Sequence, residues 1–279
     1  MPSREKLLEI AMTAAREAAA LVRERAAGAV AVAATKSTPT DPVTEADRTA
    51  EALIRQSITA QRPDDAFLGE EGGQTPARNG ASGVRWIVDP IDGTVNFLYG
   101  IARYAVSIAA EIDGVVVAGA VVDVPRGTEY TAVRRLDGSI DARRDGAAIA
   151  CRPPAPLGKR LVATGFSYDA DLRRLQAEAM VRLLPTIRDI RRIGSAALDI
   201  CGVAEGSVDG YLEEGLHLWD HAAACLVAEG AGARWEATTG IGGRRFVLCA
   251  PAHGYAELRA AAAAAGLLAP GATAGNTPD

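Results

Sequence analysis

A helical period opens the chain. Between residues 3 and 27, apolar side chains such as Leu7, Ile10 and Leu21 recur at three- and four-residue spacing, with Arg and Glu on the opposite face. This pattern predicts a long amphipathic helix that Gly28 ends.

The segment after this helix predicts a loop and then a second helix. Residues 33–42 are rich in small residues, Thr and Pro, and predict a mobile loop. A second helix is expected from about Thr44 to about residue 60.

Short apolar runs replace the helical period after residue 65. They predict strands, with the Asp113-Gly114 pair as a hairpin turn between two of them. The expected strands cover residues 67–69, 85–88, 104–112, 115–122 and 128–133. Because few helices separate them, this half predicts an antiparallel sheet.

The second half alternates strands and helices. Strands are expected at 161–164 and 208–212, and helices at 169–184, after Gly194 and at 220–231. This alternation predicts a mixed sheet flanked by helices, so the fold class is α+β or α/β. The Pro-rich stretch 151–158 divides a half at 1–150 from a half at 151–268, and residues 269–279 predict a disordered tail.

Composition narrows the function classes. The 30 Lys and Arg residues are outnumbered by 35 Asp and Glu, with no basic block, so a nucleic-acid partner is not expected. The sequence has neither a signal-peptide pattern nor an apolar run of the roughly 18 residues that a membrane span needs, so we expect a cytoplasmic protein without membrane contact. The four cysteines form no C-x-x-C pair and predict buried, reduced thiols.

Two aspartates follow the apolar strand 85–88. Pro90 cannot continue a strand ladder, so Asp89 and Asp92 are expected on one side of a turn, with the carbonyl of Ile91 between them. Hard cations such as Mg²⁺ bind oxygen ligands of this kind. The alternative is a solvated Asp-Gly turn that simply ends a strand.

Gly93 and Thr94 come next and predict the first turn of a short helix. Unpaired N–H groups at a helix start suit a phosphate. Carboxylates beside such a helix start are typical of phosphoryl-transfer sites.

Two distant acidic segments extend this pattern. Glu70 and Glu71 follow another apolar strand, and Asp220 lies at a predicted helix start. Taken alone, the first is an ordinary charge pair and the second a helix cap. If these carboxylates converged with Asp89 and Asp92, their repulsion would require cations.

Three motifs together resemble the inositol monophosphatase family along nearly the whole chain. They are Gly69-Glu70-Glu71, the stretch WIVDPIDGTVNF at 86–97, and Trp219-Asp220 followed by a small-residue helix that ends near Gly232. The resemblance implies a five-layered α-β-α-β-α sandwich, a Mg²⁺-dependent and lithium-sensitive phosphatase of a small phosphorylated polyol, and a homodimer.

The resemblance also assigns two to three Mg²⁺ ions. Glu70, Asp89 and the Ile91 carbonyl would hold one ion, and Asp89, Asp92 and Asp220 a second, with a third, weaker ion near Glu70. Water would attack phosphorus directly, without a phosphoenzyme.

The resemblance also assigns roles to Asp47, Thr94 and Lys36. Asp47 would accept a hydrogen bond from Thr94 and so orient the water, although Thr44-x-x-Asp47 also matches a helix capping box. Lys36 lies in the predicted mobile loop, which on this resemblance would close over the site and help hold metal; its alternative is an ordinary exposed lysine.

Substrate contacts follow from the same resemblance. Asp92, Gly93, Thr94 and Asp220 would contact the substrate. So would Gly194-Ser195-Ala196, which otherwise predicts an N-cap, and Glu213, otherwise a solvated strand end. His217 is expected to pack on Trp219, while Arg191, Arg192 and His221 stay unassigned.

The segment after Thr94 favours myo-inositol monophosphate as the substrate. Histidinol phosphate is the nearest competitor, and it would need acidic or aromatic groups near the leaving alcohol, which the sequence does not single out. A catalytically inactive binding or regulatory module on the same fold is the alternative outside the enzymes.

Overall fold

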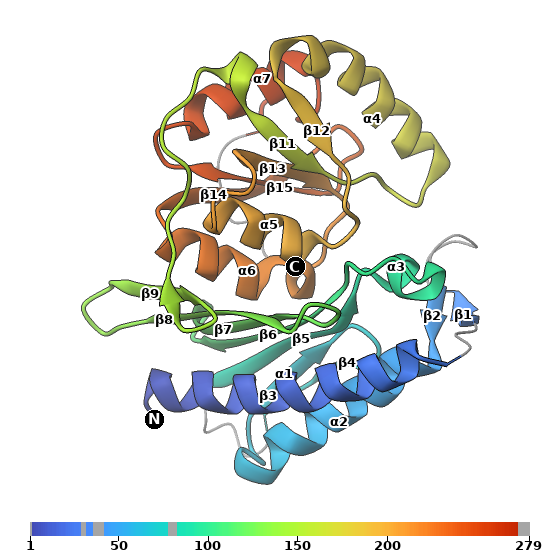
Figure 1. Cartoon of the computed structure of the whole chain (residues 1–279), viewed down its shortest axis with the longest axis vertical. Helices are drawn as coiled ribbons and strands as arrows, with labels where there is room; N and C mark the ends of the chain where they lie inside the picture. The colour runs from blue at the N-terminus through green and yellow to red at the C-terminus, as the bar shows by residue number, and fades with distance from the viewer. Residues whose placement is uncertain (1, 29–31, 36–41, 78–82, 273–279) are drawn as a thin grey trace.

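Five layers follow one another in the computed structural model, which describes residues 2–28, 32–35, 42–77 and 83–272. Helices α1 (Arg4–Ala26) and α2 (Glu45–Gln61) cover the outer face of an eight-stranded sheet. Helices α5 (Ala196–Ala204) and α6 (Leu218–Gly230) form the middle layer. A five-stranded sheet follows, with α4 (Ala170–Leu183) and α7 (Tyr255–Ala265) on its far face (Figure 1). The expected α-β-α-β-α sandwich is confirmed.

The first sheet has the order β10-β9-β8-β7-β6-β5-β3-β4. Its strands are β3 (Ala66–Gly69), β4 (Gly73–Thr75), β5 (Val84–Asp92), β6 (Ala105–Ile112), β7 (Val115–Asp123), β8 (Thr128–Arg134), β9 (Ile140–Arg144) and β10 (Ala147–Ala148). One pairing departs from the expected antiparallel sheet, because β3 runs parallel to β5. The cause is the β3–β4 hairpin at the sheet edge, after which the chain returns to the other side of β3.

The second sheet has the order β12-β11-β13-β15-β14 and is mixed, as expected. Its strands are β11 (Leu161–Thr164), β12 (Asp189–Arg191), β13 (Gly210–Glu214), β14 (Ala233–Thr239) and β15 (Arg245–Pro251). Strand β11 runs parallel to both neighbours, whereas β15 is antiparallel to β13 and β14. The sequence did not predict β12, β14, β15 or α7.

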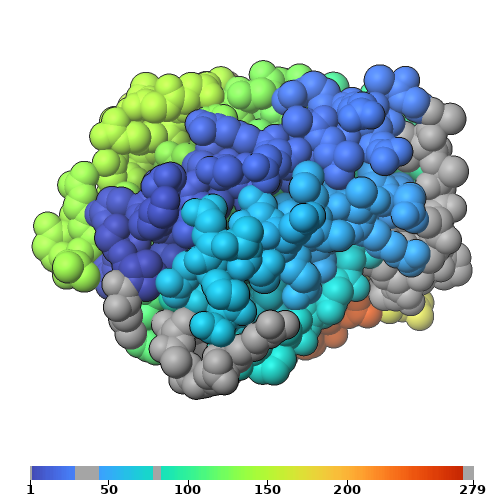
Figure 2. Space-filling model, turned by 90° about the horizontal axis from the view of Figure 1, so that it is seen from below, coloured from blue at the N-terminus to red at the C-terminus, as the bar shows by residue number. Residues whose placement is uncertain are grey.

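The two N-terminal helices match their predicted positions closely. Ser3 caps α1 by accepting a hydrogen bond from the Lys6 amide, and Leu7 and Ile10 are buried against the sheet. Figure 2 shows α1 and α2 side by side on the outer face. Small buried residues such as Ala11 and Ala15 allow this close packing.

The segment predicted as a mobile loop begins and ends in strands. Strand β1 (Val32–Thr35) pairs antiparallel with β2 (Pro42–Thr44), so that expectation was wrong for both ends. Lys36 lies outside the described residues. In the predicted tail, Ala269 donates a hydrogen bond to the Thr239 carbonyl, while residues 273–279 lie outside the described part.

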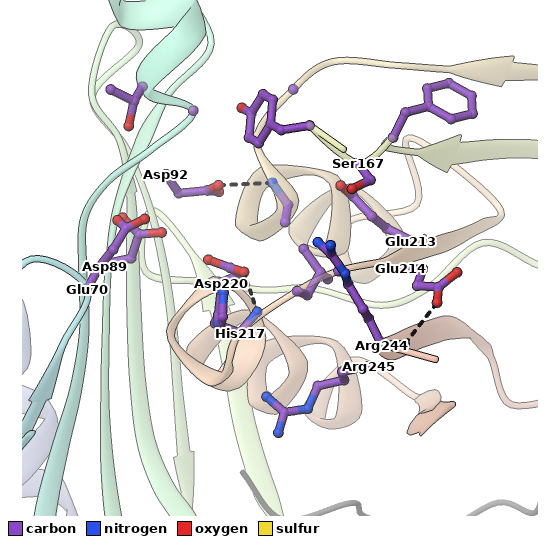
Figure 3. Close-up of a pocket in the computed structure, with 18 of the residues that line it drawn as sticks. Glu70, Asp89, Asp92, Ser167, Glu213, Glu214, His217, Asp220, Arg244 and Arg245 are labelled. Carbon is purple, nitrogen blue, oxygen red and sulfur yellow. Dashed lines mark hydrogen bonds between the residues drawn. The ribbon is translucent and has the colours of Figure 1, made fainter. Parts of the chain in front are cut away.

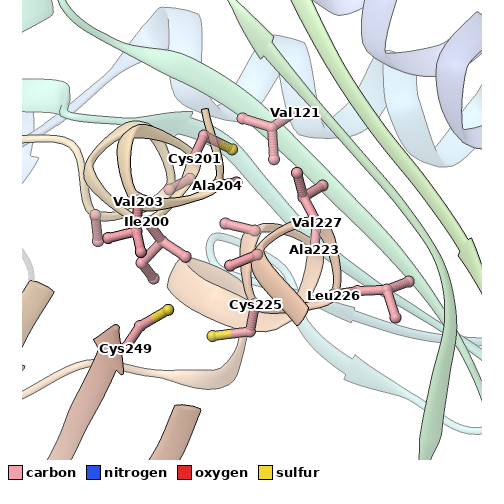
Figure 4. Close-up of a cluster of buried hydrophobic side chains, with 14 of the residues drawn as sticks. Val121, Ile200, Cys201, Val203, Ala204, Ala223, Cys225, Leu226, Val227 and Cys249 are labelled. Carbon is pink, nitrogen blue, oxygen red and sulfur yellow. The ribbon is translucent and has the colours of Figure 1, made fainter. Parts of the chain in front are cut away.

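Close packing joins the middle layer to both sheets. A Cβ atom added at Gly119 on β7 would lie 2.9 Å from the carbonyl oxygen of Ala223 on α6, so only glycine fits there. Around these helices, Cys201, Cys225 and Cys249 are buried, and burial raises their thiol pKa values (Figure 4). The expectation of buried thiols is confirmed for these three but wrong for Cys151, which is half-buried.

Within the described ranges, no helix has the length and apolar character that a bilayer span needs.

Candidate active site

A cavity of about 610 Å³ collects most of the residues that the sequence singled out. Its lining mixes carboxylates from the first sheet with residues of the middle layer and the second sheet (Figure 3). The predicted residues that line it are Glu70, Asp89, Ile91, Asp92, Gly93, Thr94, Gly194, Ala196, Glu213 and Asp220. Asp47 and Ser195 lie behind this wall and reach it through hydrogen bonds.

A bulge near the end of β5 turns its carboxylates toward the cavity. The strand continues to Asp92, so the expectation that it ended before Asp89 was wrong. Asp89 pairs with Ser107, and Asp92 pairs with Ala105. The stretch between these two pairs is therefore one residue longer on β5 than on β6. Pro90, which has no N–H to donate, fits the unpaired position, and the Ile91 amide donates to Oδ1 of Asp89 at 3.0 Å.

Carboxylates from three elements repel one another across the cavity. Burial, followed by the charges of Glu70, Asp92 and Asp220, raises the pKa of Asp89 well above its usual range. Burial and the charge of Glu70 do the same to the pKa of Asp220. A hydrogen bond with Glu70 raises the pKa of Asp89 further.

Asp92 joins β5 to the first turn of α5. Its carboxylate accepts hydrogen bonds from the Ser195 hydroxyl, from the Ala196 amide at 3.1 Å and from the Ala197 amide at 2.7 Å. Burial raises the pKa of Asp92 to about 6, although these donors pull the pKa down. Ser195 is also the N-cap of α5, as the simpler interpretation predicted.

Asp47 makes both of the predicted contacts. Its Oδ2 atom accepts a hydrogen bond from the Thr44 amide at 2.8 Å, which forms the predicted capping box at the start of α2. Its Oδ1 atom accepts a hydrogen bond from the Thr94 hydroxyl at 3.0 Å. The same hydroxyl lies 3.1 Å from the carbonyl oxygen of Ile91.

Helix α6 places Asp220 in its first turn. Oδ2 of Asp220 accepts a hydrogen bond from the His217 amide at 2.6 Å, so this residue both caps a helix and lines the cavity. The His217 ring stacks on Trp219 at 4.7 Å between centroids, as expected. His221 is buried with its ring against Trp235.

Asn96 fixes the loop that leads into α5. Its side-chain amide donates to the Arg103 carbonyl at 2.7 Å and to the Ile193 carbonyl at 2.8 Å. A Cβ atom added at Gly93 would lie 3.0 Å from the Gly194 carbonyl, so the two loops are in tight contact. This role of Asn96 was not predicted from the sequence.

The opposite end of the cavity was largely missed. Phe166 and Tyr168 follow β11, and Glu213 and Glu214 end β13. Because β11 and β13 are parallel, their carboxyl ends meet at one sheet edge, a signal that could have identified Phe166, Tyr168 and Glu214 beside the predicted Glu213. Three arginines complete the lining: Arg192, Arg244 and Arg245.

A residue of the same strand holds the side chain of Glu213 in place. Its Oε2 atom accepts a hydrogen bond from the Tyr211 hydroxyl at 2.8 Å. Burial raises the pKa of Glu213, while the Tyr211 hydroxyl and the charge of Arg192 lower it. Of the two unassigned arginines, Arg192 lines the cavity and Arg191 pairs with Asp189.

The donor set fits a hard divalent cation. Glu70, Asp89, Asp92 and Asp220 offer carboxylate oxygens in one cavity. Burial raises the pKa values of Asp89, Asp92 and Asp220, and a cation among these carboxylates would offset the cost of their buried charge. Among the described residues, no three His, Cys, Asp or Glu side chains already form a metal-binding group. The four carboxylates therefore line the same cavity but are not gathered around one metal position.

Comparison with known proteins decides the family. The model of the inositol monophosphatase family matches residues 3–269. The chain belongs to the inositol monophosphatase family. A Mycobacterium tuberculosis relative of this family, named Inositol-1-monophosphatase SuhB, is 45% identical over 269 residues, covering 90% of this chain and 91% of the relative.

Another similar protein has a different name. A Vibrio cholerae protein named Nus factor SuhB is 36% identical over 231 residues, covering 81% of this chain and 83% of that protein. Among solved structures, Mycobacterium tuberculosis SuhB matches with a TM-score of 0.79 at 39% identity, covering 96% of this chain and 99% of that chain. A Thermotoga maritima inositol monophosphatase matches with a TM-score of 0.80 at 26% identity, covering 93% and 98%.

Proposed function

We propose that this chain is a Mg²⁺-dependent phosphomonoesterase that hydrolyses myo-inositol monophosphate to inositol and phosphate. The observation that carries the proposal is the convergence of Glu70, Asp89, Asp92 and Asp220 in one cavity beside the Thr94–Asp47 hydrogen bond. Family membership supports it.

Two to three ions would be held by these carboxylates and by the carbonyl of Ile91. When bound, Mg²⁺ supplies Lewis-acid stabilisation of charge on the phosphate and lowers the pKa of a coordinated water. Asp89 interacts electrostatically with Glu70, Asp92 and Asp220, so it would be a shared ligand of this donor set.

Thr94 and Asp47 would orient the attacking water. Because the Thr94 hydroxyl donates its proton toward Asp47, its oxygen presents a lone pair that can accept a hydrogen bond from water. The water is thereby aligned for in-line attack on phosphorus, and no covalent phosphoenzyme is needed.

The polyol would bind at the opposite end of the cavity. Glu213 lines that end and accepts hydrogen bonds, which suits the hydroxyls of a cyclitol. Asp220 would contact the same ring, and the loop at Gly194 and Ala196 contributes backbone to the wall.

Histidinol phosphate is the second candidate substrate, and the structure strengthens it. Phe166, Tyr168, Glu213 and Glu214 supply the aromatic and acidic groups that this cationic, imidazole-bearing alcohol needs.

A substrate panel discriminates between the two candidate substrates. It contains inositol 1-phosphate, histidinol phosphate, fructose 1,6-bisphosphate and phosphoadenosine phosphate. We expect inositol 1-phosphate to have the highest kcat/KM; a preference for histidinol phosphate above tenfold would overturn the assignment.

A binding or regulatory role is the alternative outside the enzymes, and the name of the Vibrio cholerae relative gives a reason to test it. Several mutually repelling carboxylates in one cavity are a cost that a scaffold has no need to carry. Phosphate release with and without Mg²⁺ tests the point, and an Asp92→Asn variant that stays folded should lose activity. If no small phosphate ester is hydrolysed, the chain is not this enzyme.

The homodimer and the cytoplasmic location stay predictions that rest on family resemblance and sequence. Light scattering at several protein concentrations tests the dimer.

A further inference from the structure

A buried carboxylate outside the cavity accepts hydrogen bonds from the backbone of the turn that carries Glu70. Glu51 lies on α2, and its side chain is 5% exposed. Its Oε2 atom accepts a hydrogen bond from the Glu71 amide at 2.7 Å, and its Oε1 atom accepts one from the Gly72 amide at 2.9 Å. Both donors belong to the three-residue turn 70–72 between β3 and β4.

The backbone of the turn lies close against this carboxylate. A Cβ atom added at Gly69 would lie 2.5 Å from the Glu51 carboxyl carbon. One added at Gly72 would lie 2.5 Å from Oε1 of Glu51 and 3.0 Å from the Arg55 guanidinium. Glycine at both positions therefore lets the backbone wrap around the carboxylate.

Arg55 holds the other side of Glu51. Its Nη2 atom lies 3.5 Å from Oε1 of Glu51, and its guanidinium is itself fixed over the Phe67 ring at 3.9 Å and on the Thr75 hydroxyl at 2.9 Å. A fixed counter-charge of this kind limits the movement of the buried carboxylate.

The same turn is tied to the sheet from the opposite side. The Glu70 amide donates to the Val88 carbonyl at 3.2 Å and so extends the β3–β5 pairing by one residue. With β5 on one side and Glu51 on the other, the backbone of Glu70 is fixed and its side chain reaches the cavity beside Asp89.

Asp47 and Glu51 are four residues apart on α2 and therefore share one face of the helix. One holds Thr94 and the other holds the turn of Glu70. We propose that Glu51 is a positioning residue for the metal site, because it fixes the turn that presents the Glu70 carboxylate. The inference rests on the proposed function in one respect, that Glu70 is a cation ligand.

Binding of Mg²⁺ alone, measured by titration calorimetry, tests the inference without relying on activity. We expect Glu51→Ala to weaken Mg²⁺ affinity about 10- to 100-fold, and Glu51→Gln, which keeps one acceptor oxygen, to weaken it less. In phosphate-release assays, the Mg²⁺ concentration for half-maximal rate should rise, while kcat at saturating Mg²⁺ stays within threefold. The matched control is Ile58→Val, a buried change on the same helix that should lower Tm and leave Mg²⁺ affinity unchanged.

A double-mutant cycle separates this contact from general destabilisation. Gly72→Ala should weaken Mg²⁺ binding in the wild-type background, and it should add much less when Glu51 is already Ala, because the clash is then relieved. Additive effects, or unchanged affinity in Glu51→Ala, overturn the inference. If the wild-type chain binds Mg²⁺ but hydrolyses no ester, only the proposed function fails; if it binds no divalent cation, both fail.

Discussion

The Thr94 hydroxyl donates a hydrogen bond to Asp47 across 47 positions of sequence, at 3.0 Å. The other carboxylate oxygen of Asp47 is already engaged at the start of α2. One side chain therefore links the first turn of α3 (Thr94–Tyr99) to the N-terminal helical layer. The position of the Thr94 oxygen therefore depends on a helix cap as well as on its contact with the Ile91 carbonyl.

Removing that hydroxyl should abolish most of the activity without unfolding the protein. Thr94→Val keeps the side-chain shape but can neither donate to Asp47 nor accept from water, so kcat should fall about 10²- to 10⁴-fold. Thr94→Ser restores the hydroxyl and should recover most of the rate. Steady-state kinetics and thermal unfolding measure both effects; a Thr94→Val enzyme within threefold of wild type would contradict the assigned role.

Cation affinity should depend on pH through Asp92. Because the pKa of this buried carboxylate is raised to about 6, a proton occupies it below that pH and must leave when a cation binds. Apparent Mg²⁺ affinity should therefore fall at least about tenfold per unit as pH drops below 6, and protonation of Asp89 and Asp220, whose pKa values are also raised, should add to the loss. The Mg²⁺-induced rise in Tm between pH 5 and 8 measures it, with NaCl at equal ionic strength as the control. Constant affinity over this range would refute the link.

Glu213 should discriminate between substrates rather than drive hydrolysis. Glu213→Gln removes the charge that accepts hydrogen bonds from substrate hydroxyls, so KM for inositol 1-phosphate should rise about tenfold. Hydrolysis of p-nitrophenyl phosphate, which has no such hydroxyls, should change by less than twofold. Equal losses on both substrates would place Glu213 in the chemical step instead.

Loss of the Asn96 amide should loosen the loop before α5. Asn96→Leu leaves the carbonyls of Arg103 and Ile193 without their donor, at a cost of about 2 kcal/mol in unfolding free energy. The misplaced loop at Gly194 should also raise KM. Phe97→Leu is the matched control, since it shortens the neighbouring buried side chain without touching either carbonyl. If both variants raise KM equally, Asn96 has no specific role in the site.

The local parts of the fold were predictable from the sequence. The apolar stripe with Leu7 and Ile10 identified α1, and the Thr44–Asp47 pair marked the start of α2. The motifs around Glu70, Asp89 and Asp220 named residues that the fold brings into one cavity. These signals are periodic or contiguous, so they do not depend on tertiary contacts.

Other parts depend on partners that are distant in sequence. The alanine-rich run of α7 lacks a distinct apolar stripe, and its buried face exists only against the second sheet, around Leu258 and Ala262. The bulge in β5 is defined by its register with Ser107 and Ala105, which no local pattern reveals. Similarly, Glu51 looks like one more polar residue of a surface helix until the turn at Gly72 is folded over it.

The contact between Gly119 and Ala223 has a consequence for the dimensions of the site. The depth at which α6 lies on the first sheet is fixed by backbone against backbone, with no side chain as a spacer. Asp220 stands on α6, whereas Asp89 and Asp92 stand on that sheet. The separation between the carboxylates of α6 and those of the sheet therefore depends on a contact between two backbones, and a single methyl group at position 119 is enough to change it.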